Sequence, residues 1–434
     1  MQVHLNTKYT PDGDMSPEQI DVVTAYAKHL KEVALGGTAY QEPEASLYLP
    51  HDVAMVKETK QTLDTMGVEA VEYVFLVGIG GSNLGAMAVA NALQGRLVRS
   101  DEPQLVNLDT ISAADIDVLQ QEVRQQLRPE QYIIFVVSKS GGTTETMANA
   151  ELLLAEVFPS IETAKQRVVV ITDSGSALDQ AAKRQSLARL HLPKAVGGRY
   201  SVFSPVGMAP LYAMGVDIDA LLQGARDIQP YAWQTDITHN PAIQLAGAVA
   251  SYHECGYTVY DTFCFTPELE TLGKWGRQLI GESIGKTRVT NDQTEYVGMV
   301  PTVSVGSTDL HSVGQLYLGG RKTVFTNFLS VAEPTYETVV PTNAFFADTV
   351  PMVLGQTTTT INEAILSGTM QAYCEADRPF IQTELAAITP YELGAYMQCK
   401  MMEVMYLGAL LRINPFDQPQ VELYKTHTKD KLAH

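Results

Sequence analysis

Short apolar runs alternate with stretches of helical period along the first half of the chain. The apolar runs lie at 73–77, 105–108, 132–137 and 168–171, and the helical stretches at 84–93, 113–127 and 144–158. Runs such as Tyr132–Val137 (YIIFVV) are apolar at every position, which is typical of strands covered on both faces. Because helices connect these strands, the sheet is expected to be parallel. The pattern therefore predicts a doubly wound α/β arrangement.

A capping box predicts a helix ahead of this region. Ser16-Pro17-Glu18-Gln19 pairs a hydroxyl side chain with a glutamine three residues later and puts proline at the first helical position. Apolar residues follow at helical spacing up to Gly36-Gly37, namely Ile20, Val23, Ala27, Leu30 and Ala34. We therefore expect a helix near the N-terminus.

A second α/β cycle is expected after a helix-rich connection around 206–224. Asn240-Pro241 begins a helix that Gly256 ends, and apolar runs recur at 257–265, 299–305 and 323–330. The fold class that these patterns predict is α/β, with two doubly wound domains built on parallel sheets. The expected division is an N-terminal helical segment at 1–40, a first domain at 41–215 and a second at 216–434 with a C-terminal helical segment.

Composition and charge narrow the class of protein. Hydrophobic residues make up 45% and charged residues 18% of the 434, which is ordinary globular usage. The formal charge of -19 leaves no general basic surface for nucleic acid or anionic lipid, so any anion site must be local. The four cysteines form no C-x-x-C pair and are expected to be reduced core thiols. Neither a secretory signal nor an apolar run of the ~20 residues that span a bilayer is visible, and cytoplasmic location is expected.

The first candidate site is the glycine cluster VGIGGSNLGA at Val77–Ala86, between an apolar run and a helical stretch. Free backbone N–H groups and the helix dipole favour an anion at such a point. The cluster is not a dinucleotide fingerprint, because Asn83 stands where the last glycine is needed. It is not a Walker loop either, because Ala86-Met87 follow where that loop has Lys-Ser/Thr. A tight turn without a ligand remains the alternative interpretation.

The second cluster, SKSGGTTETMAN at Ser138–Asn149, also follows a strand and opens a helix. It offers two glycines, the charge of Lys139 and five hydroxyl side chains, those of Ser138, Ser140, Thr143, Thr144 and Thr146. Such a loop can surround a phosphate with hydrogen-bond donors. A polar N-cap region is the alternative, although an N-cap needs a single hydroxyl. Two such loops together favour a phosphorylated ligand.

Two further segments could supply a base or a positive charge. Arg199 lies in the glycine-flanked turn Gly197–Ser201 and is suited to neutralising a developing oxyanion, although such arginines are also structural. In Gly273–Lys286, Gln278 and Glu282 lie one turn apart on one helix face. The recurring glycines there favour close approach to another group, with a solvated helix face as the alternative.

The nine histidines include no H-E-x-x-H pair or other zinc spacing, so no metal site is predicted. His311, in Ser307–Gln315, stands alone, and such a histidine is usually a satisfied core or surface residue. Gln418 and Lys425 lie in the C-terminal segment Asn414–Lys425. Their spacing alone does not single them out.

Six ordered blocks resemble the phosphoglucose isomerase family. They are GIGGSNLGA, SKSGGTTET, GGRYSVFS, GRQLIGESIGK, STDLHSVGQ and NPFDQPQVELYK, spread over residues 78–425. The resemblance implies two sugar-isomerase (SIS-type) α/β/α domains and a homodimer that acts on a small-molecule sugar phosphate. It also implies cofactor-free interconversion of glucose 6-phosphate and fructose 6-phosphate through a cis-enediol, a step of glycolysis and gluconeogenesis. Metals, nucleic acid and membranes have no part in that scheme.

The roles known in the family fall on matching positions of this sequence. By this resemblance, Glu282 would be the base that moves a proton between C2 and C1, and Arg199 would stabilise the enediolate. His311, supplied by the neighbouring subunit, and Lys425 match residues linked to opening of the sugar ring. The phosphate and other substrate positions are matched by Gly81, Ser82, Ser138, Lys139, Ser140, Thr143, Glu145, Gln278 and Gln418.

The sequence departs from the family pattern at two places. Ile284 replaces the asparagine of Glu-Ser-Asn-Gly-Lys, and Pro419, Gln420 and Tyr424 stand where glycine and an aromatic residue are common. A dual phosphoglucose and phosphomannose isomerase stays open as an alternative, because the same proton transfer serves either epimer. A non-catalytic phosphosugar-sensing module is the alternative from another class, and the retained Glu282 argues against it.

Overall fold

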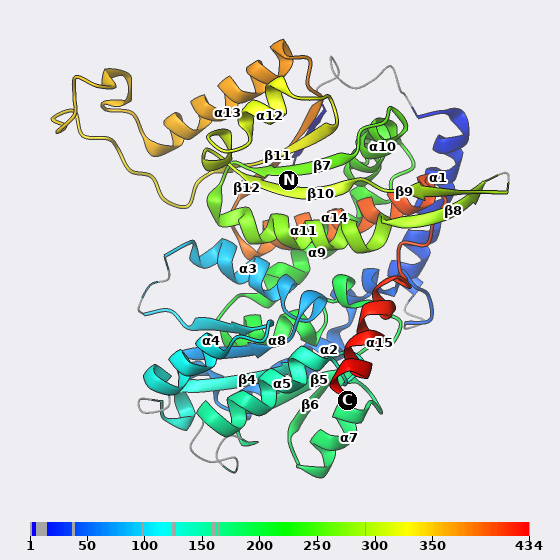
Figure 1. Ribbon diagram of the computed structural model, residues 1–434, viewed down its shortest axis with the longest axis vertical. Coiled ribbons are helices and arrows are strands. Elements are labelled where there is room, and N and C mark those ends of the chain that lie inside the picture. The colour runs from blue at the N-terminus through cyan, green and yellow to red at the C-terminus, as the bar shows by residue number, and fades with distance from the viewer. Residues whose placement is uncertain are drawn as a thin grey trace.

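A computed structural model of the chain describes residues 2–5, 15–36, 40–97, 99, 101–123, 127–157, 162, 165–290 and 292–433. Two five-stranded sheets lie one above the other with helices between them (Figure 1). A two-stranded antiparallel ribbon, β8 (Lys286–Thr290) and β9 (Gln293–Val297), projects from one side. Apart from β1, all strands of the two large sheets run parallel to their neighbours. The predicted α/β class with parallel-sheet cores is confirmed.

The first sheet has the strand order β3-β2-β4-β5-β6. Its strands are β2 (Tyr73–Val77), β3 (Gln104–Leu108), β4 (Tyr132–Val137), β5 (Val168–Asp173) and β6 (Ala188–Leu192). Val74 and Leu76 of β2 pack into the main core, whereas Phe75 and Val77 pack into a second cluster on the other face. Because helices cover both faces, the strands can be apolar at nearly every position.

The second sheet has the order β1-β12-β11-β7-β10. Its strands are β1 (Gln2–Leu5), β7 (Val259–Cys264), β10 (Val300–Val305), β11 (Val324–Glu333) and β12 (Phe380–Ala387). Tyr260 and Cys264 of β7 face the main core between the sheets. Phe263 lies in a third apolar cluster with Leu366 and Tyr373 of the outer helix α13. This sheet is therefore also covered on both faces.

Helices of the described chain fill the space between the sheets and their outer faces. They are α1 (Pro17–Gly36), α2 (Val53–Asp64), α3 (Leu84–Gln94), α4 (Ala113–Val118), α5 (Thr144–Leu152), α7 (Ala177–Arg184), α8 (Pro205–Ala213), α9 (Ile218–Ala232), α10 (Pro241–Glu254), α11 (Glu270–Ile284), α12 (Gly314–Gly319), α13 (Thr358–Glu375), α14 (Pro390–Leu410) and α15 (Val421–Leu432). The predicted capping box begins α1, since the Gln19 amide N–H donates to Ser16 Oγ (3.2 Å) and the Ser16 N–H to Gln19 Oε1 (2.8 Å). No helix of the described chain has the length and apolarity needed to cross a membrane.

Several elements differ from the sequence pattern. The helices predicted at 113–127 and 144–158 are shorter, because α4 and α5 each pass into a turn of π-helix, Leu119–Val123 and Leu153–Val157. Residues 124–126 and 158, at the ends of those predictions, lie outside the described residues, as does Gly37. The pattern also missed β6, β8, β9, β12 and the edge strand β1. β1 pairs with β12 although it lies in the segment expected to be helical. The division at 1–40, 41–215 and 216–434 stays a prediction.

Candidate functional site

The loops that follow β2 and β4 meet at one edge of the first sheet. β2 leads into a helical turn at Gly80–Ser82, and β4 leads into the hydroxyl-rich loop at 138–143. These strands are parallel neighbours, so their carboxyl ends lie side by side. A Cβ at Gly81 would lie 2.2 Å from the carbonyl carbon of Gly198, so only glycine permits this approach. Gly198 begins the turn that carries Arg199, and the first loop therefore lies directly on that turn.

Two of the hydroxyl side chains of the second loop lie within hydrogen-bond distance of each other. Ser138 Oγ lies 2.9 Å from Thr143 Oγ1, and Ser138 is only 1% exposed. Thr143 precedes α5, but its side chain makes no capping bond and stays with Ser138. Ser140 is exposed and Glu145 is half-buried in the first turn of α5, whereas Thr146 is buried. The loop therefore offers the paired hydroxyls of Ser138 and Thr143 at the helix N-terminus, where an anion is favoured.

The guanidinium of Arg199 is buried, and each of its three nitrogens donates a hydrogen bond. Nε donates to Ser283 Oγ (2.7 Å), and Nη1 donates to Gln418 Oε1 (2.7 Å). Nη2 donates to two backbone carbonyls, those of Pro415 (2.6 Å) and Asp417 (3.1 Å). These bonds fix the position of the positive charge before any substrate binds, which is the condition for stabilising charge that develops in a transition state.

The carboxylate of Glu282 lies between Arg199 and Gln278. Arg199 Nη1 approaches Glu282 Oε2 at 3.3 Å, and Gln278 Nε2 donates to Glu282 Oε1 at 2.8 Å. The one-turn spacing of Gln278 and Glu282 on α11 is thus confirmed as a direct contact. Gln278 Oε1 is buried and has no hydrogen-bond partner among the described residues. Such an atom requires a donor, and a substrate hydroxyl would supply one.

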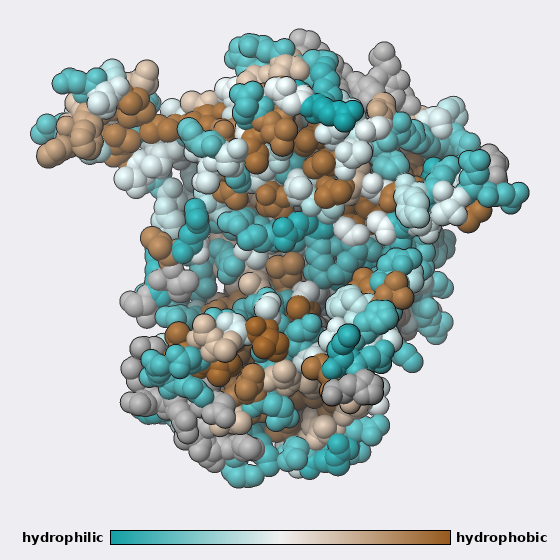
Figure 2. Space-filling view, in the orientation of Figure 1, coloured by the Kyte–Doolittle hydropathy of each residue, from teal (hydrophilic) through white to brown (hydrophobic). Residues whose placement is uncertain are grey.

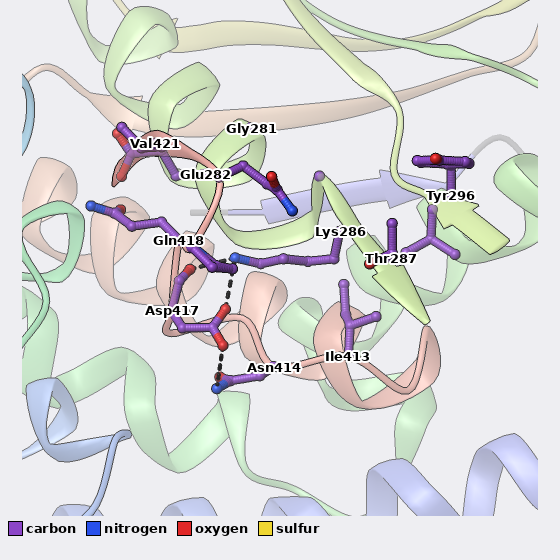
Figure 3. Close-up of a pocket in the computed structure, with 14 residues that line it drawn as sticks. Gly281, Glu282, Lys286, Thr287, Tyr296, Ile413, Asn414, Asp417, Gln418 and Val421 are labelled. Carbon is purple, nitrogen blue, oxygen red and sulfur yellow. Dashed lines mark hydrogen bonds and ion pairs between the residues drawn. The ribbon is translucent and has the colours of Figure 1, made fainter. Parts of the chain in front are cut away.

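A cavity of about 720 Å³ opens beside Glu282 (Figure 3). Its described lining comes from the end of α11, the β8–β9 ribbon and the loop before α15. Lys286 forms an ion pair with Asp417 Oδ1 (3.0 Å) and also donates to the Asp417 carbonyl, and Gln418 lies beside them. The volume suits a small polar ligand. Because Glu282 touches both this cavity and Arg199, it joins the cavity to the loops at the sheet edge.

Similarity to known proteins extends over most of the chain. A sequence model of phosphoglucose isomerase matches residues 53–434. The chain belongs to the phosphoglucose isomerase family. The glucose-6-phosphate isomerases of Symbiobacterium thermophilum and Leuconostoc mesenteroides subsp. mesenteroides are each 33% identical to it, over 82% and 81% of this chain and 78% of each relative.

Solved structures share the fold of this chain. A hypothetical protein from Thermus thermophilus matches with a TM-score of 0.86 at 28% identity and covers 100% of both chains. A glucose-6-phosphate isomerase from Chlamydia trachomatis matches with a TM-score of 0.73 at 20% identity, over 99% of this chain and 80% of that chain. The second likeness establishes a shared fold.

The structure brings most of the expected phosphoglucose isomerase site residues to one region. Hydrogen bonds and one close backbone approach link five segments: the glycine loop, the hydroxyl loop, the Arg199 turn, α11 and the loop before α15. These segments carry Gly81, Ser82, Ser138, Lys139, Ser140, Thr143, Glu145, Arg199, Gln278, Glu282 and Gln418. His311 lies elsewhere, exposed at the end of the short helical turn Thr308–Leu310 beside α12. The assignments themselves stay predictions.

Lys425 is half-exposed on α15, where its ammonium pairs with Glu422 Oε1 at 2.8 Å. It does not line the cavity, but Val421, one turn earlier on the same helix face, does. Lys425 therefore lies one helical turn from a residue of the cavity wall, with its ammonium bound to Glu422. An exposed pair of this kind contributes little to stability.

The Lys139 ammonium does not point into the hydroxyl loop. It donates to the backbone carbonyls of Lys194 (2.9 Å) and Val196 (2.8 Å), just before the turn that carries Arg199. Burial lowers the pKa of Lys139 from its ordinary value, with Asp173 opposing the shift. Lys139 thus ties the hydroxyl loop to the Arg199 turn, a role that its place in the sequence did not reveal.

We expect Lys139→Met to lower kcat by about ten- to a hundredfold. The segment before the Arg199 turn would lose two hydrogen bonds from a charged group. A resulting misplacement of Arg199 that raises the activation barrier by about 1.4–2.7 kcal/mol gives this factor. Steady-state kinetics would check this, with Lys194→Met as the control that removes an exposed charge from the same loop. A rise in KM with unchanged kcat would instead mean that Lys139 acts through its charge on the phosphate.

Other side chains of the site region were not singled out by the sequence. Ser283 accepts a hydrogen bond from Arg199, and the ion pair of Lys286 and Asp417 lines the cavity. All three residues lie inside the blocks GRQLIGESIGK and NPFDQPQVELYK, and this position was the signal in the sequence that could have found them. Ile284, the departure from the family pattern, is 1% exposed and packs in the main core. An apolar residue at this position therefore serves packing.

One group of possible metal ligands comes together within the described chain, although no spacing predicted it. The ligand atoms of His29, Glu42 and Glu44 lie within 4.8 Å of one another. Glu44 already accepts a hydrogen bond from Tyr26 (2.7 Å) and lies 3.6 Å from His29. None of the three lines the cavity beside Glu282.

Proposed function

We propose that the protein interconverts D-glucose 6-phosphate and D-fructose 6-phosphate through a cis-enediol intermediate. The observation that carries the proposal is the carboxylate of Glu282 held 3.3 Å from the preformed Arg199 guanidinium, beside two loops suited to a phosphate. Moving a proton between adjacent carbons next to a carbonyl requires one base and one stabiliser of negative charge. This pair supplies both.

In the proposed reaction Glu282 removes the proton from C2 of the open-chain aldose and returns it to C1. Arg199 stabilises the oxygen that becomes negative in the enediolate. The unpartnered Gln278 Oε1 accepts a hydrogen bond from a sugar hydroxyl and orients the reacting carbons. These steps are proton transfers only, so the proposal includes no cofactor.

Ring opening precedes the proton transfer. In the proposal Lys425, reaching from α15, and His311 of a second copy of the chain act on the closed sugar. His311 is exposed and does not line the cavity beside Glu282 of its own chain, so a homodimer that shares its two sites is part of the proposal. The proposal also places the enzyme in the cytoplasm, because charged sugar phosphates do not cross the bilayer core.

A coupled assay that detects glucose 6-phosphate formed from fructose 6-phosphate tests the function directly. Turnover by the purified protein is expected, and its absence in the concentrated protein would overturn the proposal. The same assay with mannose 6-phosphate separates the strict isomerase from the dual enzyme, because epimer choice depends on the shape of the pocket.

We expect the double variant Ser138→Ala/Thr143→Ala to raise KM by about tenfold or more, because hydrogen bonds to a charged phosphate contribute about 1.5–3 kcal/mol each. Some loss of kcat is compatible with this role, since the bound phosphate also helps to orient the reacting carbons. Thr65→Ala, which removes an exposed hydroxyl at the end of α2, is the control. An unchanged KM in the double variant would contradict the phosphate assignment.

A further inference from the structure

Residues 414–418 form the loop before α15, and we call this segment the 414–418 loop. Its first half is held by packing. Pro415 is buried and lies against Gly408 of α14, and the Phe416 ring lies 5.4 Å from the ring of Tyr200. The last two residues of the loop are held by polar contacts, and these contacts decide where the end of the loop lies.

Lys286 binds the loop at Asp417. Its ammonium pairs with Asp417 Oδ1 at 3.0 Å and also donates to the carbonyl of the same residue, as Figure 3 shows. Asn414 Nδ2 donates to the other carboxylate oxygen of Asp417 at 3.1 Å. The Lys286 side chain is only 9% exposed, and its residue begins β8 opposite Val297 of β9. The ammonium therefore extends from a hydrogen-bonded ribbon that starts four residues after Glu282.

The end of the loop in turn positions the guanidinium of Arg199. Nη2 donates to the Asp417 carbonyl at 3.1 Å, and this is the oxygen that also accepts from Lys286. Nη1 donates to Gln418 Oε1 at 2.7 Å and lies 3.3 Å from Glu282 Oε2. Because one carbonyl receives both cations, a shift of Asp417 would be passed to the nitrogen that faces Glu282.

The Asp417 carboxylate also competes for Arg199. Arg199 already donates to the backbone of this residue, and a guanidinium binds carboxylates strongly through two parallel hydrogen bonds. Lys286 offsets the negative charge, and without it the carboxylate would draw the guanidinium away from Glu282. The Asp417 side chain is 53% exposed, and Figure 2 shows mainly hydrophilic residues between the ribbon and α15. Water would therefore solvate Asp417 after loss of the ammonium, and the fold should be kept.

We propose that Lys286 is a positioning residue for the isomerisation. It holds the 414–418 loop against Arg199 and offsets the Asp417 carboxylate, so the guanidinium stays directed at the oxygen that becomes negative. Lys286 acts through Arg199 and does not contact the reacting carbons. This inference rests on the proposed function for the reaction that Lys286 serves, whereas the contact between Lys286 and the loop does not depend on it.

The variant Lys286→Met tests the inference because it keeps the length of the side chain and removes the ammonium. Its kcat should fall by about tenfold or more, with the KM for fructose 6-phosphate within about twofold of native, since other loops bind the phosphate. The loss is expected to be smaller than the ~10²–10³-fold that follows removal of a direct oxyanion donor. Lys274→Met is the matched control, because it removes an ammonium that pairs with Glu270 on α11 at 2.7 Å. Both kinetic constants of the control should be native.

A second change separates positioning from a general disturbance of the loop. Lys286→Met/Asp417→Asn should have a kcat about threefold or more above that of Lys286→Met, because the amide removes the charge that competes for Arg199. A disturbance of packing would not be repaired by a further lost contact. An unchanged kcat in Lys286→Met, an effect on KM alone, or a double variant no more active than Lys286→Met would each overturn the inference.

Hydrogen exchange tests the hold on the loop without using the reaction. The Phe416 N–H donates to Asn414 Oδ1 at 2.9 Å, and amide exchange in the 414–418 loop should be about tenfold faster in Lys286→Met than in the native chain or Lys274→Met. Circular dichroism checks that the variants are folded. Unchanged exchange would overturn the hold of Lys286 on the loop. A native protein that never converts fructose 6-phosphate would overturn the proposed function, whereas faster exchange would still establish that hold.

Discussion

Glu282→Gln is expected to lower isomerisation by about 10²–10⁴-fold while phosphosugar binding is retained. Glutamine has the shape of glutamate but cannot take the proton from C2. The fold around it should be kept, because Arg199 retains its bonds to Ser283, Gln418 and two backbone carbonyls. The change thus removes the proposed base and leaves the preformed positive charge in place.

Exchange of solvent deuterium into C1 of fructose 6-phosphate measures the proton transfer itself. The exchange should fall together with turnover in Glu282→Gln. Glu270→Gln is the matched control, since Glu270 lies on the same helix but pairs with Lys274 at 2.7 Å, away from Arg199. Undiminished exchange in Glu282→Gln would show that another group is the base.

Local features of the site could be predicted from the sequence. The contact between Gln278 and Glu282 follows from helical spacing alone, and the two loops follow from strands that end at the same sheet edge. Gly81 is understood from the structure as a place where two backbones meet. These features depend on residues close in sequence or on the parallel order of neighbouring strands, both of which leave a pattern.

Features made by distant segments left no such pattern. Arg199 is fixed by Ser283 and by carbonyls of Pro415 and Asp417, which lie 84, 216 and 218 residues away in the chain. Lys139 carries the positive charge expected to bind a phosphate, yet its ammonium donates hydrogen bonds to backbone carbonyls 55 and 57 residues further along the chain. Only tertiary packing decides which polar group such a side chain meets.

Strands at the margins of the fold were missed for a related reason. β1 is an edge strand of only four residues, and β8–β9 is a mostly exposed ribbon, so neither gives a long apolar run in the sequence. Hydrophobic patterning predicts long buried strands and gives no signal for short or exposed ones.

Mixing a Glu282→Gln dimer with a His311→Ala dimer, after gentle dissociation and reassociation, is expected to restore activity. If His311 acts across the interface, each mixed dimer has one site with both changes and one native site. Random reassociation of equal amounts makes half of the dimers mixed, so about one quarter of all sites should be native. The coupled fructose 6-phosphate assay should then return about one quarter of the native activity.

A site whose histidine comes from its own chain predicts no recovery of activity in the mixture. If each chain supplies its own histidine, every site in the mixture keeps one change, and activity stays at the sum of the two parents; that result would remove the shared site and leave Glu282 as the base.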